Sequence, residues 1–208
     1  MDGKHAIDRT ANRGSRRQPT FTRVAVVAIA ALLGATPRAR AEDVPASRQV
    51  LIVLRALAYD GNLKTRAGET INIAVMHKKG NSASEQSANA ISHAFKTLQS
   101  TLVAGLPIDI TPLAYAGPDS LKKALLGSGI DLLYVCEGFE SEIDAIKEIT
   151  RDASVLTVGT RQSYVEKGLS FGVFELDGKN TILLNLPSSR YEGAAFASDL
   201  LRLAKVLR

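Results

Sequence analysis

Apolar residues recur along residues 48–208 at two alternating spacings, one helical and one extended. Three- and four-residue spacing predicts amphipathic helices, whereas short apolar or β-branched runs predict strands. In chain order, the pattern predicts a helix over 48–59, a strand Thr70–His77, a helix with Ile91, Phe95, Leu98 and Leu102 along one stripe, a strand Pro107–Leu113, a helix Pro118–Leu126, a strand Ile130–Cys136, a helix Glu140–Asp152 and a strand Val155–Val158. Strands that alternate with helices favour right-handed βαβ units and a parallel sheet.

The last quarter of the chain follows a different pattern. Two strand-like runs, Leu169–Leu176 and Thr181–Leu186, flank Asp177-Gly178, a dipeptide that suits the tight turn of a β-hairpin. Ser189 and Glu192 have the spacing of a capping box, so a helix is expected to begin there. The apolar face of this helix consists of Phe196, Leu200, Leu203 and Leu207. We expect this closing helix to pack on the sheet, and a membrane or a partner is the alternative neighbour of its apolar face.

Together these elements predict a single-domain α/β protein with a mainly parallel sheet of βαβ units, a C-terminal β-hairpin and a closing helix. Residues 42–208 are long enough for one domain to bury its own core without disulfides. The chain has one cysteine, Cys136, in an apolar stretch. It is expected to be a buried small residue rather than a reactive thiol.

The N-terminal residues have the three parts of a secretory signal peptide. Residues 1–23 are polar and basic, Val24–Ala35 is apolar, and Ala39-Arg40-Ala41 is a small-x-small cleavage site. Twelve apolar residues are too few to span a bilayer, which takes roughly 20, although an uncleaved anchor is the alternative. The stretch Ser15–Phe21 (SRRQPTF) also resembles a twin-arginine export signal. The sequence therefore predicts a signal peptide over 1–41 and export to the periplasm.

Export changes the meaning of the net charge. The whole chain carries +5, from 26 Lys and Arg against 21 Asp and Glu. Residues 1–41 hold eight of the basic and two of the acidic residues, so residues 42–208 keep 18 and 19, a net charge of −1. Because the excess of basic residues belongs to the leader, we expect no nucleic-acid partner.

Candidate binding residues follow the predicted strands, where open α/β sheets bind ligands. They are Gly80, Ser82, Glu137, Gly138, Gly159 and Arg161. The loop that contains Gly80 and Ser82 precedes a helix, so it suits either an anion or an ordinary strand-to-helix turn. No nucleophile, zinc or phosphate-loop motif occurs, and the histidines lack ligand spacing. We expect neither catalysis nor a cofactor or metal.

The segment Leu156–Val206 resembles the C-terminal half of the YfiR family, exported proteins of Gram-negative bacteria. The matching features are the strand LTVG (Leu156–Gly159), a loop that reaches Lys167-Gly168, a hairpin that ends in Ile182–Leu186 (ILLNL), and the closing stretch Ala197–Val206 (ASDLLRLAKV). The early helix and the βαβ core extend the resemblance over most of residues 42–208.

The resemblance implies a non-enzymatic periplasmic regulator. Family members bind the periplasmic portion of an inner-membrane diguanylate cyclase and hold it inactive, which limits cyclic-di-GMP and biofilm formation. Whether the chain also forms a homodimer is left open by the sequence. A single cysteine argues against the disulfide-based redox control of some members. The alternative function is a small exported ligand-binding domain that uses the crevice at Gly80, Glu137 and Gly159.

Cleavage between Ala41 and Glu42 is expected to leave a mature protein that begins at Glu42. The intact mass of the periplasmic form measures this directly. A species that keeps Met1 in the membrane fraction would instead support the uncleaved anchor.

Overall fold

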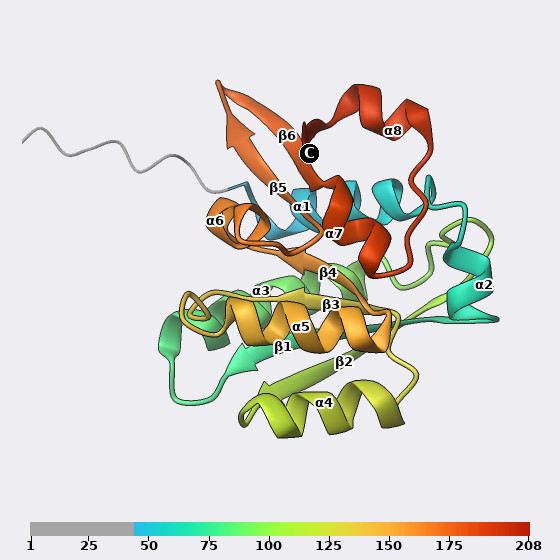
Figure 1. Ribbon diagram of the computed structural model, residues 1–208. Helices are drawn as coiled ribbons and strands as arrows, with labels where there is room; N and C mark the ends of the chain where they lie inside the picture. Colours follow the sequence, from blue (N-terminus) through green and yellow to red (C-terminus); the bar gives the residue numbers. More distant parts are fainter. Residues whose placement is uncertain (1–43) are drawn as a thin grey trace, which may run out of the picture. The chain divides into compact units, whose positions relative to one another are not determined.

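The computed structural model describes residues 44–208 (Figure 1). The predicted signal peptide over 1–41 and its cleavage between Ala41 and Glu42 lie outside these residues. Across the part of the chain that is described, no helix is both long enough and apolar enough to cross a bilayer.

One seven-stranded sheet runs through the described residues in the order β2-β1-β3-β4-β5-β6-β7. Its strands are β1 (Ile71–Lys78), β2 (Ile108–Tyr115), β3 (Leu132–Val135), β4 (Leu156–Gly159), β5 (Phe171–Leu176), β6 (Lys179–Asn185) and β7 (Lys205–Leu207). The pairs from β2 through β5 are parallel, β5 and β6 are antiparallel, and β7 is parallel to β6. The predicted α/β fold, a mainly parallel sheet with a hairpin near its C-terminal end, is confirmed.

Helices cover both faces of this sheet (Figure 1). They are α1 (Ala46–Leu57), α2 (Leu63–Ala67), α3 (Ser82–Thr97), α4 (Pro118–Gly127), α5 (Ile143–Ala153), α6 (Gln162–Glu166), α7 (Leu186–Tyr191) and α8 (Ser198–Leu203). In β1, Ile73 and Val75 join the apolar cluster of α1, α3 and α8, whereas Ala74 and Met76 join that of α4, α5 and α6. Burial on both faces explains why the central strands are nearly continuous apolar runs.

The chain changes its direction of travel across the sheet at β1. From β1 it passes through α3 to β2, and then through α4 to β3 on the other side of β1. Because α3, which follows β1, and α5, which follows β3, pack on opposite faces, the connections after β1 and β3 leave the sheet in opposite directions. This is a topological switch point, the place where open α/β sheets bind ligands.

Asp177 and Gly178 make the turn between β5 and β6, as the sequence predicts. Their φ angles are 52° and 71°, and Leu176 pairs with Lys179 across the turn. Two successive residues with positive φ give a tight turn whose twist matches that of the flanking strands. Glycine adopts this conformation without strain, and aspartate tolerates it better than most residues do.

The C-terminal segment differs from the single closing helix that the sequence predicts. Helix α7 ends at Tyr191, and Gly193, with a φ of 86°, turns the chain away. Helix α8 follows after a short extended stretch, and then β7 pairs with β6. The predicted capping box is wrong, because Ser189 lies inside α7 and Glu192 follows it. Pairing with β6 outweighs helical propensity here, since the edge of β6 would otherwise leave backbone groups unpaired.

Shorter helices also change which leucines are buried. Leu200 is 2% exposed, as expected, but Leu203 of the same helix is 69% exposed. The predicted apolar stripe of α3 also loses its last residue, because α3 ends at Thr97 and Leu102, beyond it, is 61% exposed. Leu102 was placed by extending a helical period past the end of α3, whereas Leu203 is the last residue of α8 and lies on its exposed side.

Leu200→Asp is expected to lower the free energy of unfolding by more than ~3 kcal/mol, because it removes a buried side chain and places a carboxylate in the core. Thermal unfolding followed by circular dichroism measures the loss. Leu203→Asp, in the same helix, is the matched control and is expected to change stability by less than about 0.5 kcal/mol. An unchanged melting temperature for Leu200→Asp would show that α8 does not pack on the sheet.

Candidate functional site

The carboxyl ends of β1, β3 and β4 form one edge of the sheet, and the predicted binding residues gather there. The six are Gly80, Ser82, Glu137, Gly138, Gly159 and Arg161. Gly80 lies in the connection from β1 to α3 and Ser82 is the first residue of α3, two of the six follow β3, and two lie at the end of β4 or just after it. Because β1, β3 and β4 are parallel neighbours, the sequence placed these residues on the correct edge. Ligand binding by them stays a prediction.

Side chains of the protein itself fill the crevice between β1 and β3. A β-carbon at Gly138 would lie 2.9 Å from Asn81 Nδ2. Lys78 crosses the same gap, with its Nζ 2.6 Å from Glu142 Oε1 and 3.4 Å from the carbonyl oxygen of Gly138. Burial opposes ionisation of Glu142, but hydrogen bonds and the charge of Lys78 outweigh it and lower the pKa of this carboxyl. The switch point is therefore occupied by an ion pair and an asparagine.

Two amides at the entry to α3, one in the loop and one in the first turn, already have partners. Asn81 is the N-cap residue, and its Oδ1 accepts a 3.0 Å hydrogen bond from the amide of Ser84. The amide of Gly80 donates to Glu85 Oε1 over 2.8 Å. These contacts engage donors that an anion would approach. They give the loop a structural role, and anion binding at Gly80 and Ser82 is not needed to explain it.

Two of the predicted residues lie at the carboxyl end of β4: Arg161 forms an ion pair, and Gly159 allows close packing. Arg161 Nη2 lies 3.2 Å from Glu137 Oε2 in a partly exposed ion pair, which joins the end of β3 to that of β4. Gly159 is buried, and a β-carbon there would lie 3.1 Å from the β-carbon of Tyr164. Gly159 therefore allows α6 to approach the sheet, which is a packing role.

A cleft of about 440 Å³ opens beside this edge, between the first turn of α1 and the first half of α3. Its polar lining consists of Gln49, Gln86, Ser87, Glu137 and Thr160. Of the six predicted residues, Glu137 lines it. Sequence reasoning missed the two glutamines because they come from helices that meet the strand ends only in the folded protein. A carboxylate among amides and hydroxyls suits a small polar molecule with hydrogen-bond donors.

Cys136 is buried, as predicted for a small core residue. Burial raises the pKa of its thiol to about 12, so the thiol is protonated and unreactive at neutral pH. Within residues 44–208, no group of three His, Cys, Asp or Glu side chains is arranged to hold a metal ion.

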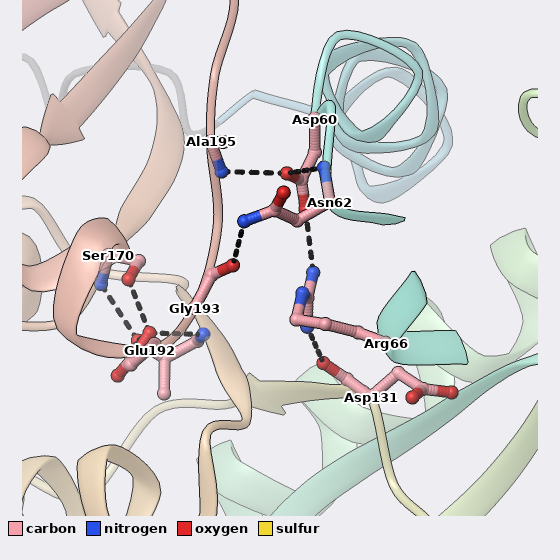
Figure 2. A network of polar contacts seen from close by, with 9 residues as sticks. Asp60, Asn62, Arg66, Asp131, Ser170, Glu192, Gly193 and Ala195 are labelled. Carbon is pink, nitrogen blue, oxygen red and sulfur yellow. Dashed lines mark hydrogen bonds and ion pairs between the residues drawn. The ribbon is translucent and has the colours of Figure 1, made fainter. Parts of the chain in front are cut away.

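A second polar centre, which the sequence analysis missed, surrounds the fully buried Glu192. Its carboxylate accepts hydrogen bonds from the hydroxyls of Thr150 (2.9 Å) and Thr157 (3.0 and 2.9 Å) and from the amide of Thr157 (2.8 Å). It also accepts a hydrogen bond from the hydroxyl of Ser170 (Figure 2). Burial raises the pKa of Glu192 to about 7, although these donors oppose the shift. The four groups come from α5, β4, the start of β5 and the end of α7, so this carboxyl joins four parts of the domain.

An aspartate holds the extended stretch that follows Glu192. Asp60 accepts a 2.8 Å hydrogen bond from the amide of Ala195 and forms a buried 2.7 Å ion pair with Arg66 (Figure 2). Asn62 Nδ2 donates to the carbonyl of Gly193 over 3.0 Å. These contacts tie the turn between α1 and α2 to residues more than a hundred positions later, which is why no local pattern predicts them.

These features define a doubly wound α/β domain whose switch point is filled and whose buried polar groups are structural. Comparison with protein families gives its class: the model for YfiR/HmsC-like proteins (DUF4154) matches residues 49–205. The chain belongs to the YfiR/HmsC-like family. Membership supports a periplasmic regulatory role, and the resemblance over residues 156–206 is confirmed at the level of the family. The comparison with curated proteins finds no match.

Solved structures that share the fold include the following three proteins. One is a conserved domain protein from Vibrio cholerae (TM-score 0.56, 14% identity, 79% of this chain and 60% of that one). Another is an ABC domain in complex with L-Trp from Streptococcus pneumoniae (TM-score 0.56, 11% identity, 79% and 62%). The third is the open, ligand-free form of a substrate binding protein with adhesive properties from Clostridium difficile (TM-score 0.51, 14% identity, 71% and 57%). The chain spans about three fifths of the length of these structures.

Glu192→Gln is expected to remove a pH dependence of stability. Because the pKa of Glu192 is about 7 in the folded protein against an ordinary 4.5, the fold favours the protonated form. Its contribution is fully present below pH 4.5 and is lost as the pH rises through about 7, a change of about 3 kcal/mol. Urea unfolding at several pH values measures it.

Glu175→Gln, at an exposed position of β5, is the control and is expected to keep the slope of the unaltered protein. A Glu192→Gln variant that keeps this slope between pH 4.5 and 7 would show that Glu192 does not titrate there.

Proposed function

We propose that this protein is an exported, non-enzymatic regulator that binds the periplasmic portion of an inner-membrane diguanylate cyclase and holds it inactive. The observation that carries the proposal is family membership over residues 49–205. The function described for YfiR-like proteins is repression of such a cyclase, so the partner class comes from the family. The predicted signal peptide supports it, because export would place the chain on the side of the membrane where that portion lies.

Repression of this kind needs no chemistry. A regulator that binds the inactive form of the cyclase more tightly shifts the equilibrium toward that form, and the size of the shift is limited by the difference in affinity. To keep a two-state partner about 99% inactive when it would otherwise be 99% active takes a roughly 10⁴-fold preference. The buried, protonated Cys136 supports a mechanism that does not depend on a thiol switch within the chain.

One observation favours a second function, the binding of a small molecule in the cleft of about 440 Å³ beside Glu137 and Thr160. The cleft is large enough for a metabolite and offers a carboxylate, amides and hydroxyls. The crevice at the switch point is filled by Asn81 and Lys78, so a ligand would bind beside α1 instead. A bound metabolite and a bound cyclase are compatible, because the first can regulate the second.

Deletion of the gene is expected to raise cellular cyclic-di-GMP and surface attachment, because the cyclase loses its repressor. Mass spectrometry of nucleotide extracts measures the first, and crystal-violet staining measures the second. The matched pair of complementing genes differs only in residues 1–41: the complete gene is expected to restore the low level, and the gene without the leader is expected to fail.

Unchanged cyclic-di-GMP after deletion would count against the regulatory function. If the purified protein then bound a metabolite tightly, and Glu137→Ala abolished that binding, the ligand-binding function would replace it.

A further inference from the structure

A groove with an apolar floor lies between α1 and α3, next to the polar cleft, and Ala46 and Ala90 line both. Its volume is about 730 Å³, and it is formed by the first half of α1 and the second half of α3. The floor consists of Leu51, Ala90, Ala94 and Leu98. These side chains are small or partly buried, so the floor is a shallow trough between two helix ridges, the shape that accepts a third helix.

The rim of this groove is cationic. Arg48 lines it, Arg55 follows two turns later on the same face of α1, and Lys96 of α3 stands next to the lining residue Thr97. The side chains of Arg48, Arg55 and Lys96 are exposed. In residues 44–208, none of them forms an ion pair. Within the described residues, no carboxylate neutralises these charges.

Acidic groups are scarce on the two helices. Helix α1 has none, and the single acid of α3, Glu85, lies at the far end, where it accepts the hydrogen bond from Gly80. Glu42 and Asp43, which precede α1 in the sequence, lie outside the described residues. The groove thus combines an apolar floor with a positively charged rim, although residues 42–208 as a whole carry a net charge of −1.

We propose that this groove binds an amphipathic helix with acidic flanks, supplied by the periplasmic portion of the cyclase partner. The inference rests on the proposed function and adds the surface and the chemistry of the segment that occupies it. An apolar stripe on the incoming helix would cover Leu51 and Leu98, and its acidic flanks would face Arg48 and Lys96, which gives both affinity and orientation.

The charge and the shape of the groove argue against two other occupants, a second copy of this chain and a bilayer surface. A second copy of this chain, related by a two-fold axis, would bring cationic rims together, and like charges across an interface are unfavourable. A bilayer surface would satisfy the charges, but a concave trough between two helices contacts a flat surface poorly and fits a rod-shaped helix well.

Arg48→Glu combined with Lys96→Glu tests the surface in cells. In the deletion strain, this double variant is expected to leave cyclic-di-GMP near the level of the strain without the gene. Lys122→Glu with Lys123→Glu, two exposed lysines of α4 on the other face of the sheet, is the matched control and is expected to repress normally. Equal periplasmic amounts and melting temperatures show that both variants fold.

The outcomes in cells separate the two proposals. If deletion itself leaves cyclic-di-GMP unchanged, the proposed function fails. If deletion raises it and the Arg48→Glu, Lys96→Glu variant represses as well as the unaltered protein, the function stands and the groove is overturned as the docking surface.

A charge-swap experiment with peptides tests the groove without the cyclase. The probes are two 18-residue helical peptides with the same leucine stripe, one flanked by glutamates and one by lysines, and fluorescence anisotropy with the mature protein measures binding. The glutamate peptide is expected to bind, and to bind about tenfold more weakly to the double variant, since two attractive pairs become repulsive. The lysine peptide is expected to show the reverse preference.

Three results would overturn the inference: equal binding of both peptides to the unaltered protein, binding that does not change in the double variant, or a concentration-dependent dimer that the double variant abolishes. Binding to vesicles of anionic phospholipid that is lost in the double variant, without binding of the glutamate peptide, would assign the groove to a membrane instead.

Discussion

The carboxyl group of Glu192 is the contact on which the C-terminal third of the domain depends. It lies without exposure to solvent among hydroxyls of α5, β4 and the start of β5, and none of the ion pairs in residues 44–208 involves it. A buried carboxyl without a cation keeps its proton more readily than one in water, and it needs every hydrogen bond that surrounds it. Burial of this group therefore holds α7 at one position on the sheet, and that position determines where the following residues meet the rest of the protein.

Much of the sheet could be predicted because its information is local. The runs that became β1, β3 and β4 are apolar since both faces are covered, and Asp177-Gly178 specifies its own turn. The C-terminal segment could not be predicted, because its contacts are made with residues far away in the sequence. The spacing of Ser189 and Glu192 suits a helix cap, yet the glutamate accepts hydrogen bonds from α5, β4 and the start of β5 instead.

The same difference between local patterns and distant contacts decides which residues of the candidate site could be predicted. Strand order places Glu137 and Gly159 at one edge, and the position of each strand end followed from the apolar runs. The space beside that edge depends on where α1 crosses α3, and nothing in the sequence of either helix states this. Gln49 and Gln86 therefore entered the site only with the structure, as did Asn81, whose side chain fills the crevice where a ligand was expected.

The turn between α1 and α2 and the stretch around Ala195 are neighbours in the fold but 135 residues apart along the chain. During synthesis, which proceeds from the N-terminus, Asp60 and Arg66 emerge long before the backbone amide that completes their network. Until that amide arrives, one of the aspartate's acceptor positions has no protein partner, and the sheet lacks both the edge strand β7 and the apolar cover of α8. The domain thus reaches its final packing only after its last residues have been added.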